Sequence, residues 1–373
     1  MTLRVLLVAG EASGDLHGAA LVRALRARHP DVAVVGVGGP RLRDAGMEVL
    51  VDTEHVATMG VTETFGTLGR LLATYRRLVR RLDEARPDLV VLIDYPEFNL
   101  RLARQAKRRG IPVFYFVAPQ VWAWRRGRIR RIAARVDKLA AVFPFEPAVY
   151  NTGGRQLAEF VGHPLLDVVA PTRPAAETRA RYGLAADRPV VALLPGSRKQ
   201  EVELLYGPMC GAAQRLAAEG WQPITALAES LTVADLAAAR GGQPAPVPVA
   251  HADTYNVVAA ADAAIVASGT ATVETALLGC PMVIAYRLAP LTYWIARRLV
   301  DVDFIGMPNI ILQRGVFPEV IQDAVTPERL AAAVRDVYGR RAEVAAALVA
   351  LRAALGTPGA AGRAAALALE LVS

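Results

Sequence analysis

The stretch Leu3-Arg4-Val5-Leu6-Leu7-Val8-Ala9, followed by Gly10-Glu11-Ala12-Ser13-Gly14-Asp15, decides the fold class. The short apolar run predicts a buried β-strand, because it is bounded by a glycine-containing loop. The segment after the loop, Leu16–Arg28, has helical periodicity. A strand, a tight loop and a helix in this order predict the first half of a βαβ unit.

The same pattern recurs along the chain and then starts again. Apolar runs fall at 32–37, 89–93, 113–117 and 139–142, and a second series falls at 190–194, 224–227, 263–267 and 282–285. Segments with helical periodicity lie between several of these runs, at 100–109, 201–218, 254–260 and 271–278. We therefore expect an α/β fold with two doubly wound, Rossmann-like parallel-sheet domains that face a cleft.

The length of 373 residues fits two domains. The segment Asp167–Pro189 contains several prolines and little periodicity, which indicates a linker. We expect a first domain over 1–166, a second over 167–355 and a C-terminal helix over 356–373. This helix could cross back to the first domain or be swapped between subunits.

Composition narrows the class of protein. Apolar residues make up 53% and charged residues 21%, which is typical of a folded chain. Two cysteines are too few for a disulfide framework, no secretory signal is visible, and the five histidines lack ligand-like spacing. These features favour a cytoplasmic protein without a metal or a membrane-spanning helix.

The net charge of +8 favours phosphate-rich or anionic-membrane partners. A bias toward arginine with solvated faces explains it equally well. A nucleic-acid-binding module is a third alternative, but no motif supports it.

Polar residues follow two predicted strands of the first series. Glu11, Ser13, Gly14 and Asp15 follow the first strand, where a helix N-terminus could receive an anion or a sugar hydroxyl. The alternative is an ordinary turn capped by Ser13 or Asp15.

A second polar loop, Asp94-Tyr95-Pro96-Glu97-Phe98-Asn99, follows the run 89–93. Asp94 stands at a strand tip, where it could accept a proton from an attacking hydroxyl. Asn99, at the end of this loop, is a candidate substrate-binding residue. The alternative is an Asx-turn with a helix cap at Asn99. By contrast, Gly36-Val37-Gly38-Gly39 lacks the dinucleotide fingerprint, and we interpret it as a turn.

Aromatic and basic residues follow the run 113–117. Trp122 and Trp124 could stack on a sugar ring or pack in the core. The six arginines between Arg125 and Arg135 form either a solvated helix face or a basic rim for phosphate.

Two loops in the second series suit a diphosphate. Gly196, Ser197 and Arg198 offer a tight turn, backbone N–H groups and a guanidinium fork. Ser268, Gly269 and Thr270 place small hydroxyl residues at a predicted helix N-terminus, and Glu274 one turn later could bind ribose hydroxyls. His163 lies near the domain boundary and is either structural or substrate-binding.

The segment Phe65–Leu82 repeats apolar residues at helical spacing, flanked by arginines. It predicts either a core helix with a solvated basic face or a helix that lies on an anionic membrane surface.

Taken in order, these motifs resemble the lipid-A-disaccharide synthases. The resemblance rests on Gly10–Asp15, Ile93–Asn99, Val121–Trp124, Gly162–Pro164, Leu193–Arg198, Ala267–Glu274, Pro281–Arg287 and Leu299–Asn309. It implies a GT-B glycosyltransferase that needs no cofactor or metal. The implied reaction transfers 2,3-diacylglucosamine from UDP to 2,3-diacylglucosamine 1-phosphate, with inversion, to give a β-1,6-linked disaccharide.

The resemblance also implies site residues. Asp94 matches the candidate general base, with Glu11 as the next candidate. Glu11, Arg198, Glu274 and Asn309 match positions important for activity or donor binding, whereas Glu97 stands where relatives often carry Asp. The expected partners are a UDP-sugar donor, an acylated sugar phosphate acceptor and an anionic membrane surface on the inner face of the inner membrane.

A homodimer is possible on this interpretation, and no nucleic acid is expected as a partner. Rival interpretations within the same fold are a UDP-sugar epimerase and a different lipid-linked sugar transferase.

Overall fold

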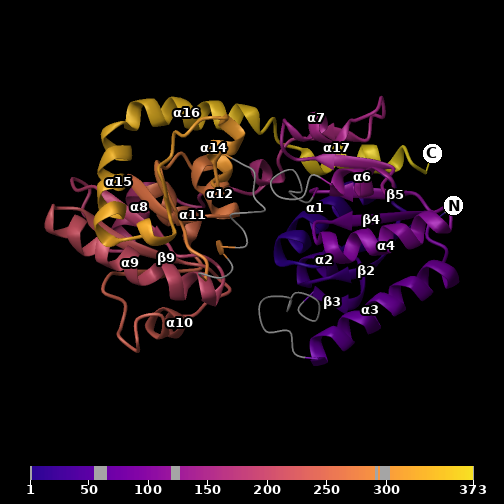
Figure 1. The fold of residues 1–373 in the computed structure, drawn as a ribbon, viewed down its shortest axis with the longest axis horizontal. Coiled ribbons are helices and arrows are strands. Elements are labelled where there is room, and N and C mark those ends of the chain that lie inside the picture. The colour runs from indigo at the N-terminus through magenta and orange to yellow at the C-terminus, as the bar shows by residue number, and fades with distance from the viewer. Residues whose placement is uncertain (1, 54–64, 119–126, 290–292, 295–302, 373) are drawn as a thin grey trace. The chain divides into compact units, whose positions relative to one another are not determined.

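A computed structural model describes residues 2–53, 65–118, 127–289, 293–294 and 303–372. The chain divides into two compact units (Figure 1). Unit 1 comprises Met1–Asp167 together with Leu355–Ser373, and unit 2 comprises Val168–Ala354. The chain therefore passes from one unit to the other twice.

Unit 1 is built on a seven-stranded parallel sheet with the order β3-β2-β1-β4-β5-β6-β7. The order changes direction between β1 and β4, which is the topological switch point of a doubly wound fold. The strands are β1 (Arg4–Ala9), β2 (Ala33–Gly38), β3 (Glu48–Asp52), β4 (Leu89–Ile93), β5 (Val113–Phe116), β6 (Lys138–Ala141) and β7 (Ala158–Phe160).

The central strands of unit 1 are buried on both faces, because helices pack on each side. Leu6 and Val8 of β1 share one apolar cluster with Leu102 of α4 and Leu78 of α3. α17 packs against α1 and β6 (Figure 1, in yellow). The helices are α1 (Ala12–Arg28), α2 (Pro40–Asp44), α3 (Phe65–Glu84), α4 (Pro96–Arg108), α6 (Arg128–Ala133), α7 (Glu146–Tyr150) and α17 (Ala360–Leu369), with a short 3₁₀ turn, η2 (Pro164–Asp167).

Unit 2 repeats this plan with a six-stranded parallel sheet of order β10-β9-β8-β11-β12-β13. Its switch point lies between β8 and β11. The strands are β8 (Val190–Leu194), β9 (Gln222–Leu227), β10 (Val249–His251), β11 (Ala263–Ala267), β12 (Met282–Tyr286) and β13 (Glu319–Ile321).

The helices of unit 2 cover this sheet, with α9 packed on α15 and α8 packed on α11. They are α8 (Ala175–Arg181), α9 (Lys199–Ala218), α10 (Val233–Ala238), α11 (Thr254–Ala260), α12 (Thr270–Leu277), α14 (Met307–Leu312), α15 (Pro327–Gly339) and α16 (Arg341–Ala354), with a 3₁₀ turn, η3 (Gln322–Ala324). The expected fold class, two doubly wound parallel-sheet units, is confirmed.

Two local predictions are wrong. The glycine-rich segment after the second apolar run is not a turn, because Gly36 to Gly38 belong to β2. A Cβ at Gly36 would lie 1.9 Å from the Leu7 carbonyl oxygen, so only glycine lets β2 approach β1 there. The segment expected as a linker is largely folded onto unit 2, since it contains α8 and since Arg179 pairs with Asp262 at 2.8 Å.

No helix among the described residues is long and apolar enough to cross a membrane.

Candidate active site

The switch point of unit 1 brings two acidic residues to the same edge of the sheet. β1 and β4 are neighbours, and Ala9 pairs with Ile93 in their register. Glu11 and Asp94 follow these two strand ends, so they project from adjacent loops. Ligands of doubly wound sheets bind at this position, beyond the carboxyl ends of the strands at the switch point.

Asp94 stands on an unusual backbone. Asp94 and Tyr95 both have left-handed conformations, with φ values of 45° and 47°. This conformation costs roughly 1–2 kcal/mol for each non-glycine residue. The surrounding structure holds it, because the buried amide of Asn99 donates to the carbonyl oxygens of Ile93 at 3.1 Å and Asp94 at 2.7 Å. The Tyr115 hydroxyl donates to the same Asp94 carbonyl.

Asn99 is therefore a positioning residue. It is fully buried inside α4, and its amide is directed at the loop that carries Asp94. The alternative interpretation, a helix cap at Asn99, is wrong, because the N-cap of α4 is Tyr95. A role of Asn99 in substrate binding stays a prediction. Burial, together with the charge of Glu11, raises the pKa of Tyr95 to about 12, so this phenol stays protonated beside the two carboxylates.

The Gly10–Asp15 loop contributes differently from what the sequence predicted. The N-cap of α1 is Glu11, and neither Ser13 nor Asp15 caps that helix with its side chain. The buried Asp15 carboxylate instead accepts hydrogen bonds from the backbone N–H groups of Gly39, Arg41 and Leu42, at 2.7–3.1 Å. Asp15 thus anchors the start of α2. Gly14 is buried and Ser13 is half-buried in the first turn of α1.

His163 is buried together with a second histidine that sequence reasoning missed. Its Nδ1 accepts from the Leu165 N–H at 3.2 Å, and its ring lies 5.2 Å from that of Phe143. Burial and the nearby His17 lower the pKa of His163 to about 3. Burial lowers the pKa of His17 to about 4. These contacts fix the His163 ring inside unit 1, and its role in substrate binding stays a prediction.

In unit 2, the first predicted phosphate loop follows β8 and is held by Glu201. Gly196 has φ +120°, and a Cβ there would lie 2.6 Å from that of Glu201, so glycine is required. The Glu201 carboxylate accepts from the backbone N–H groups of Ser197 at 3.0 Å and Arg198 at 3.3 Å. These two groups are thus already hydrogen-bonded. The Arg198 side chain is 72% exposed, so its guanidinium is accessible to a ligand.

The second loop follows β11, the strand next to β8, so both loops lie at the same edge of the sheet of unit 2. α12 begins at Thr270, its N-cap is Gly269, and no side chain caps it. Gly269 and Thr270 are exposed, whereas Ser268 is half-buried. A helix N-terminus of this kind presents backbone N–H groups to an anion.

Glu274 lies one turn into α12 and is half-buried. Burial raises the pKa of its carboxyl group, and a 3.1 Å hydrogen bond from the Tyr255 hydroxyl partly offsets this. The hydrogen bond fixes the orientation of one carboxylate oxygen.

Asn309 is buried in α14, and both its amide nitrogen and its amide oxygen are hydrogen-bonded to other residues of the protein. Its Nδ2 donates to the Phe317 carbonyl and to Glu319, both at 2.8 Å, and its Oδ1 accepts from the N–H groups of Val316 and Phe317 at 3.0 Å. Glu319 also accepts from the Ile305 and Gly306 N–H groups at 2.9 Å. Asn309 therefore shapes the chain around 305–317.

The predicted stacking residues Trp122 and Trp124 lie outside the described residues.

The apolar residues of α3 face mainly the core. The buried Leu78 and Leu82 pack in the core of unit 1, with Leu71, Tyr75 and Val79 packed against it. The apolar stripe of α3 is thus largely a core face, whereas Leu72 is 42% exposed.

Sequence reasoning missed several supporting residues. Tyr115, Tyr255 and Glu319 hold site loops through side chains that lie far away in sequence, and no local pattern marks them. Glu201 was recognisable in principle, because an acidic residue in the first turn of a helix often accepts from the preceding loop.

The architecture defines the class of protein. The chain is similar to the solved glycosyltransferase of kitacinnamycin, with a TM-score of 0.67, 18% identity and full coverage of both chains. It is also similar to a UDP-GlcNAc 2-epimerase from Neisseria meningitidis, with a TM-score of 0.62, 12% identity and 99% coverage of both chains. The fold is therefore that of the GT-B glycosyltransferases and the UDP-sugar epimerases that share it.

The family follows from sequence. The family model described as "Lipid-A-disaccharide synthetase" matches residues 5–347. Lipid-A-disaccharide synthase of Syntrophus aciditrophicus is 47% identical over 99% of this chain and 97% of its own length. The enzyme of Geobacter sulfurreducens is 43% identical over the same shares. The chain belongs to the lipid-A-disaccharide synthase family, and it is a glycosyltransferase of lipid A biosynthesis.

Proposed function

We propose that the protein transfers 2,3-diacylglucosamine from UDP-2,3-diacylglucosamine to 2,3-diacylglucosamine 1-phosphate. The 6-hydroxyl oxygen of the acceptor bonds to the anomeric carbon of the donor as the bond from that carbon to the UDP oxygen breaks. The hydroxyl proton passes to a protein carboxylate, and UDP leaves with the electron pair. Direct displacement inverts the α-linked donor to a β-1,6-linked product.

Unit 1 supports the acceptor side of this reaction. Asp94 is the proposed base, because it lies at the switch point on a backbone that Asn99 and Tyr115 hold rigid. A fixed position matters, because a base must lie within hydrogen-bonding reach of the proton that it removes. Glu11, on the adjacent loop, is the alternative base.

Unit 2 supports the donor side. The exposed Arg198 guanidinium and the uncapped N-terminus of α12 suit the diphosphate, since both stabilise negative charge on a departing phosphate. Glu274, oriented by Tyr255, suits the ribose hydroxyls.

One observation carries the proposal. Each unit places its chemically distinctive loops at its own switch point, with carboxylates in unit 1 and anion-binding groups in unit 2. A base in one unit and a nucleotide site in the other are the two functions that this transfer needs.

The direct test is an assay with the purified chain that measures UDP release and the mass of the product. We expect a disaccharide 1-phosphate from the diacylated donor and acceptor, and little UDP release when UDP-N-acetylglucosamine replaces the donor. Epimerisation of UDP-N-acetylglucosamine without any transfer would instead identify an epimerase and refute the proposal.

The donor site makes a second prediction. Arg198→Ala should weaken UDP binding about tenfold, the loss expected for one charged hydrogen-bonding partner. Activity should persist in EDTA, because Arg198 and the α12 N–H groups would stabilise the diphosphate. A strict requirement for Mg²⁺ would contradict this arrangement.

The expected location is the cytoplasmic face of the inner membrane, with peripheral contact to anionic lipid. The acyl chains of both proposed substrates favour this location, as does the net charge of +8. A homodimer stays a prediction.

A further inference from the structure

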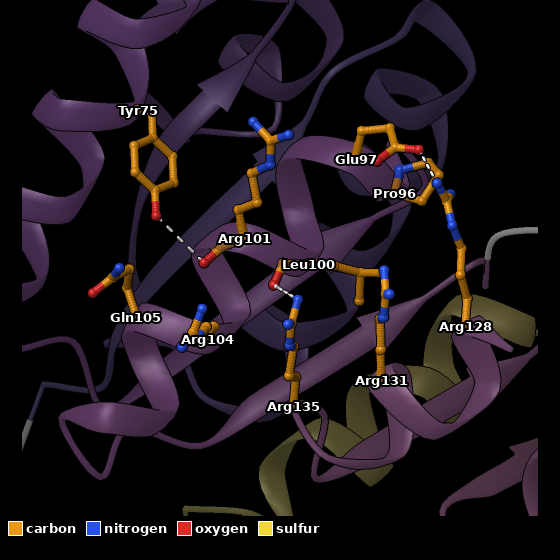
Figure 2. A pocket seen from close by; sticks show the side chains of 10 residues that line it. All are labelled: Tyr75, Pro96, Glu97, Leu100, Arg101, Arg104, Gln105, Arg128, Arg131 and Arg135. Atoms are coloured by element: carbon orange, nitrogen blue, oxygen red, sulfur yellow. Dashed lines mark hydrogen bonds and ion pairs between the residues drawn. The ribbon is translucent and has the colours of Figure 1, made fainter.

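Unit 1 also contains a cavity of about 330 Å³ between α4 and α6, with Tyr75 of α3 at its side. Five arginines line it: Arg101, Arg104, Arg128, Arg131 and Arg135. Figure 2 shows the three from α6 and the turn after it extending toward α4. Glu97 is the one carboxylate in the described lining.

The positive charge of this cavity is only partly balanced. Arg128 pairs with Glu97, and Arg135 donates to the Leu100 carbonyl at 3.1 Å (Figure 2). Arg101, Arg104 and Arg131 make no side-chain hydrogen bond or ion pair with any residue that the structure describes. Burial and the charges of Arg104 and Arg131 lower the pKa of Arg135, as expected where cations gather without enough anions.

The arginines of this cavity differ from the others of unit 1 because five of them line one small volume. Some arginines of unit 1 pair with carboxylates at the surface, as Arg109 does with Asp83 at 2.7 Å and Arg43 with Asp52 at 3.1 Å, and others in the described part of the unit stand singly on exposed helix faces. In the cavity, like charges approach one another instead. A bound anion would relieve that repulsion.

The chemistry of the lining indicates which anion. Guanidinium groups bind phosphate oxygens through paired hydrogen bonds, and several of them around one cavity suit a doubly charged group. The volume exceeds that of a phosphate alone, so it leaves room for part of the group that carries it. Pro96 and Glu97 of the lining come two and three residues after Asp94 in sequence, which places the cavity beside the loop of the proposed base.

We propose that this cavity binds the phosphate of a lipid headgroup. Two sources share this chemistry: the 1-phosphate of the acceptor, an assignment that rests on the proposed function, and the phosphate of an anionic phospholipid. α3, which lines one side through Tyr75, also carries the exposed Leu72.

The test compares two double variants that remove the same charge from the same helices. Arg104→Ala with Arg131→Ala removes two lining groups, whereas Arg108→Ala with Arg130→Ala removes two exposed arginines outside the cavity. Melting curves of both variants should match that of the wild type, because all four side chains are exposed.

Three measurements separate the sources. The first is calorimetric binding of glucosamine 1-phosphate against glucosamine, which needs no turnover. The second is the acceptor KM in neutral detergent micelles. The third is co-sedimentation with phosphatidylcholine vesicles, with and without phosphatidylglycerol.

If the acceptor phosphate binds here, the cavity variant binds glucosamine 1-phosphate about tenfold or more weakly, and its acceptor KM rises by a similar factor. Its donor KM stays unchanged. If a phospholipid binds here, the variant loses its preference for phosphatidylglycerol and keeps its acceptor KM. The proposal is overturned if the cavity variant stays within twofold of the control variant in all three measurements. Because the binding and vesicle measurements do not depend on transfer, an inactive wild type would refute the proposed function without deciding this site.

Discussion

Asp94 carries its carboxylate on a left-handed backbone that Asn99 and Tyr115 support. We predict that Asp94→Asn lowers the transfer rate by about 10²–10⁴-fold, the usual contribution of a general base. The substitution preserves size and leaves the backbone bonds in place, so the melting temperature should stay near that of the wild type. A pure variant that keeps more than half of its turnover would assign the base to Glu11.

The lowered pKa values of the buried His17 and His163 should make the stability of the protein depend on pH. Both have folded-state pKa values below the ordinary value of 6.5, at about 4 and about 3. The unfolded chain therefore binds more protons than the folded chain below pH 6.5, and stability falls as the pH drops through this range. Each histidine contributes a slope of at most about 1.4 kcal/mol per pH unit.

Urea unfolding at pH 7.5 and pH 5.5 measures this slope. His17→Gln removes one of the two groups, so its slope between these pH values should be about half that of the wild type. An unchanged slope would show that the buried pair does not control the acid sensitivity.

The roles of individual polar residues were only partly predictable from sequence. Asp15, Asn99 and Asn309 stand in loops and helix ends where substrate-binding residues also occur, but their side chains bind the protein's own backbone. A carboxylate or an amide suits both tasks equally. Whether such a side chain binds substrate or backbone depends on which chain segments lie next to it, and the tertiary fold determines this.

At the scale of elements, the strands found from sequence are the central ones. The apolar runs at 89–93, 190–194 and 263–267 coincide with β4, β8 and β11. These strands are buried on both faces, so they form continuous apolar runs. The missed strands β3, β7, β10 and β13 are the four edges of the two sheets. An edge strand has one neighbour and can be short and partly exposed, which leaves no such run.

α3 carries both an exposed leucine, Leu72, and a fully buried one, Leu78, and substitutions at the two should have different effects. Leu72→Ser should leave the melting temperature unchanged and reduce binding to anionic vesicles, because Leu72 is 42% exposed on a helix rich in arginine. Leu78→Ser should destabilise the fold by about 2–5 kcal/mol, because Leu78 is fully buried. A triple change of Phe65, Leu68 and Leu72 to Ser should weaken vesicle binding further, although the side chains of Phe65 and Leu68 lie outside the described residues.

Melting scans and vesicle co-sedimentation measure both effects. If Leu72→Ser lowers the melting temperature as much as Leu78→Ser does, the exposed part of α3 belongs to the core and not to a membrane surface.

At the scale of the molecule, α17 ties the end of the chain to unit 1. Ala364 of α17 is fully buried, whereas Ala366 on the same helix is exposed. Ala364→Gln should therefore destabilise unit 1 by roughly 1–3 kcal/mol through overpacking, and Ala366→Gln should be neutral. In the Ala364→Gln variant, backbone hydrogen exchange should become faster in unit 1 and stay unchanged in unit 2. Equal effects in both units would contradict the assignment of α17 to unit 1.

Because the chain crosses between the two units twice, unit 2 is completed before unit 1 in the order of synthesis. Every residue of unit 2 has been synthesised by Ala354, when unit 1 still lacks Leu355–Ser373. Domains generally fold as units during synthesis. In the order of synthesis, the face of unit 1 that receives α17 therefore stays uncovered until all of unit 2 and then Leu355–Ser373 have been made.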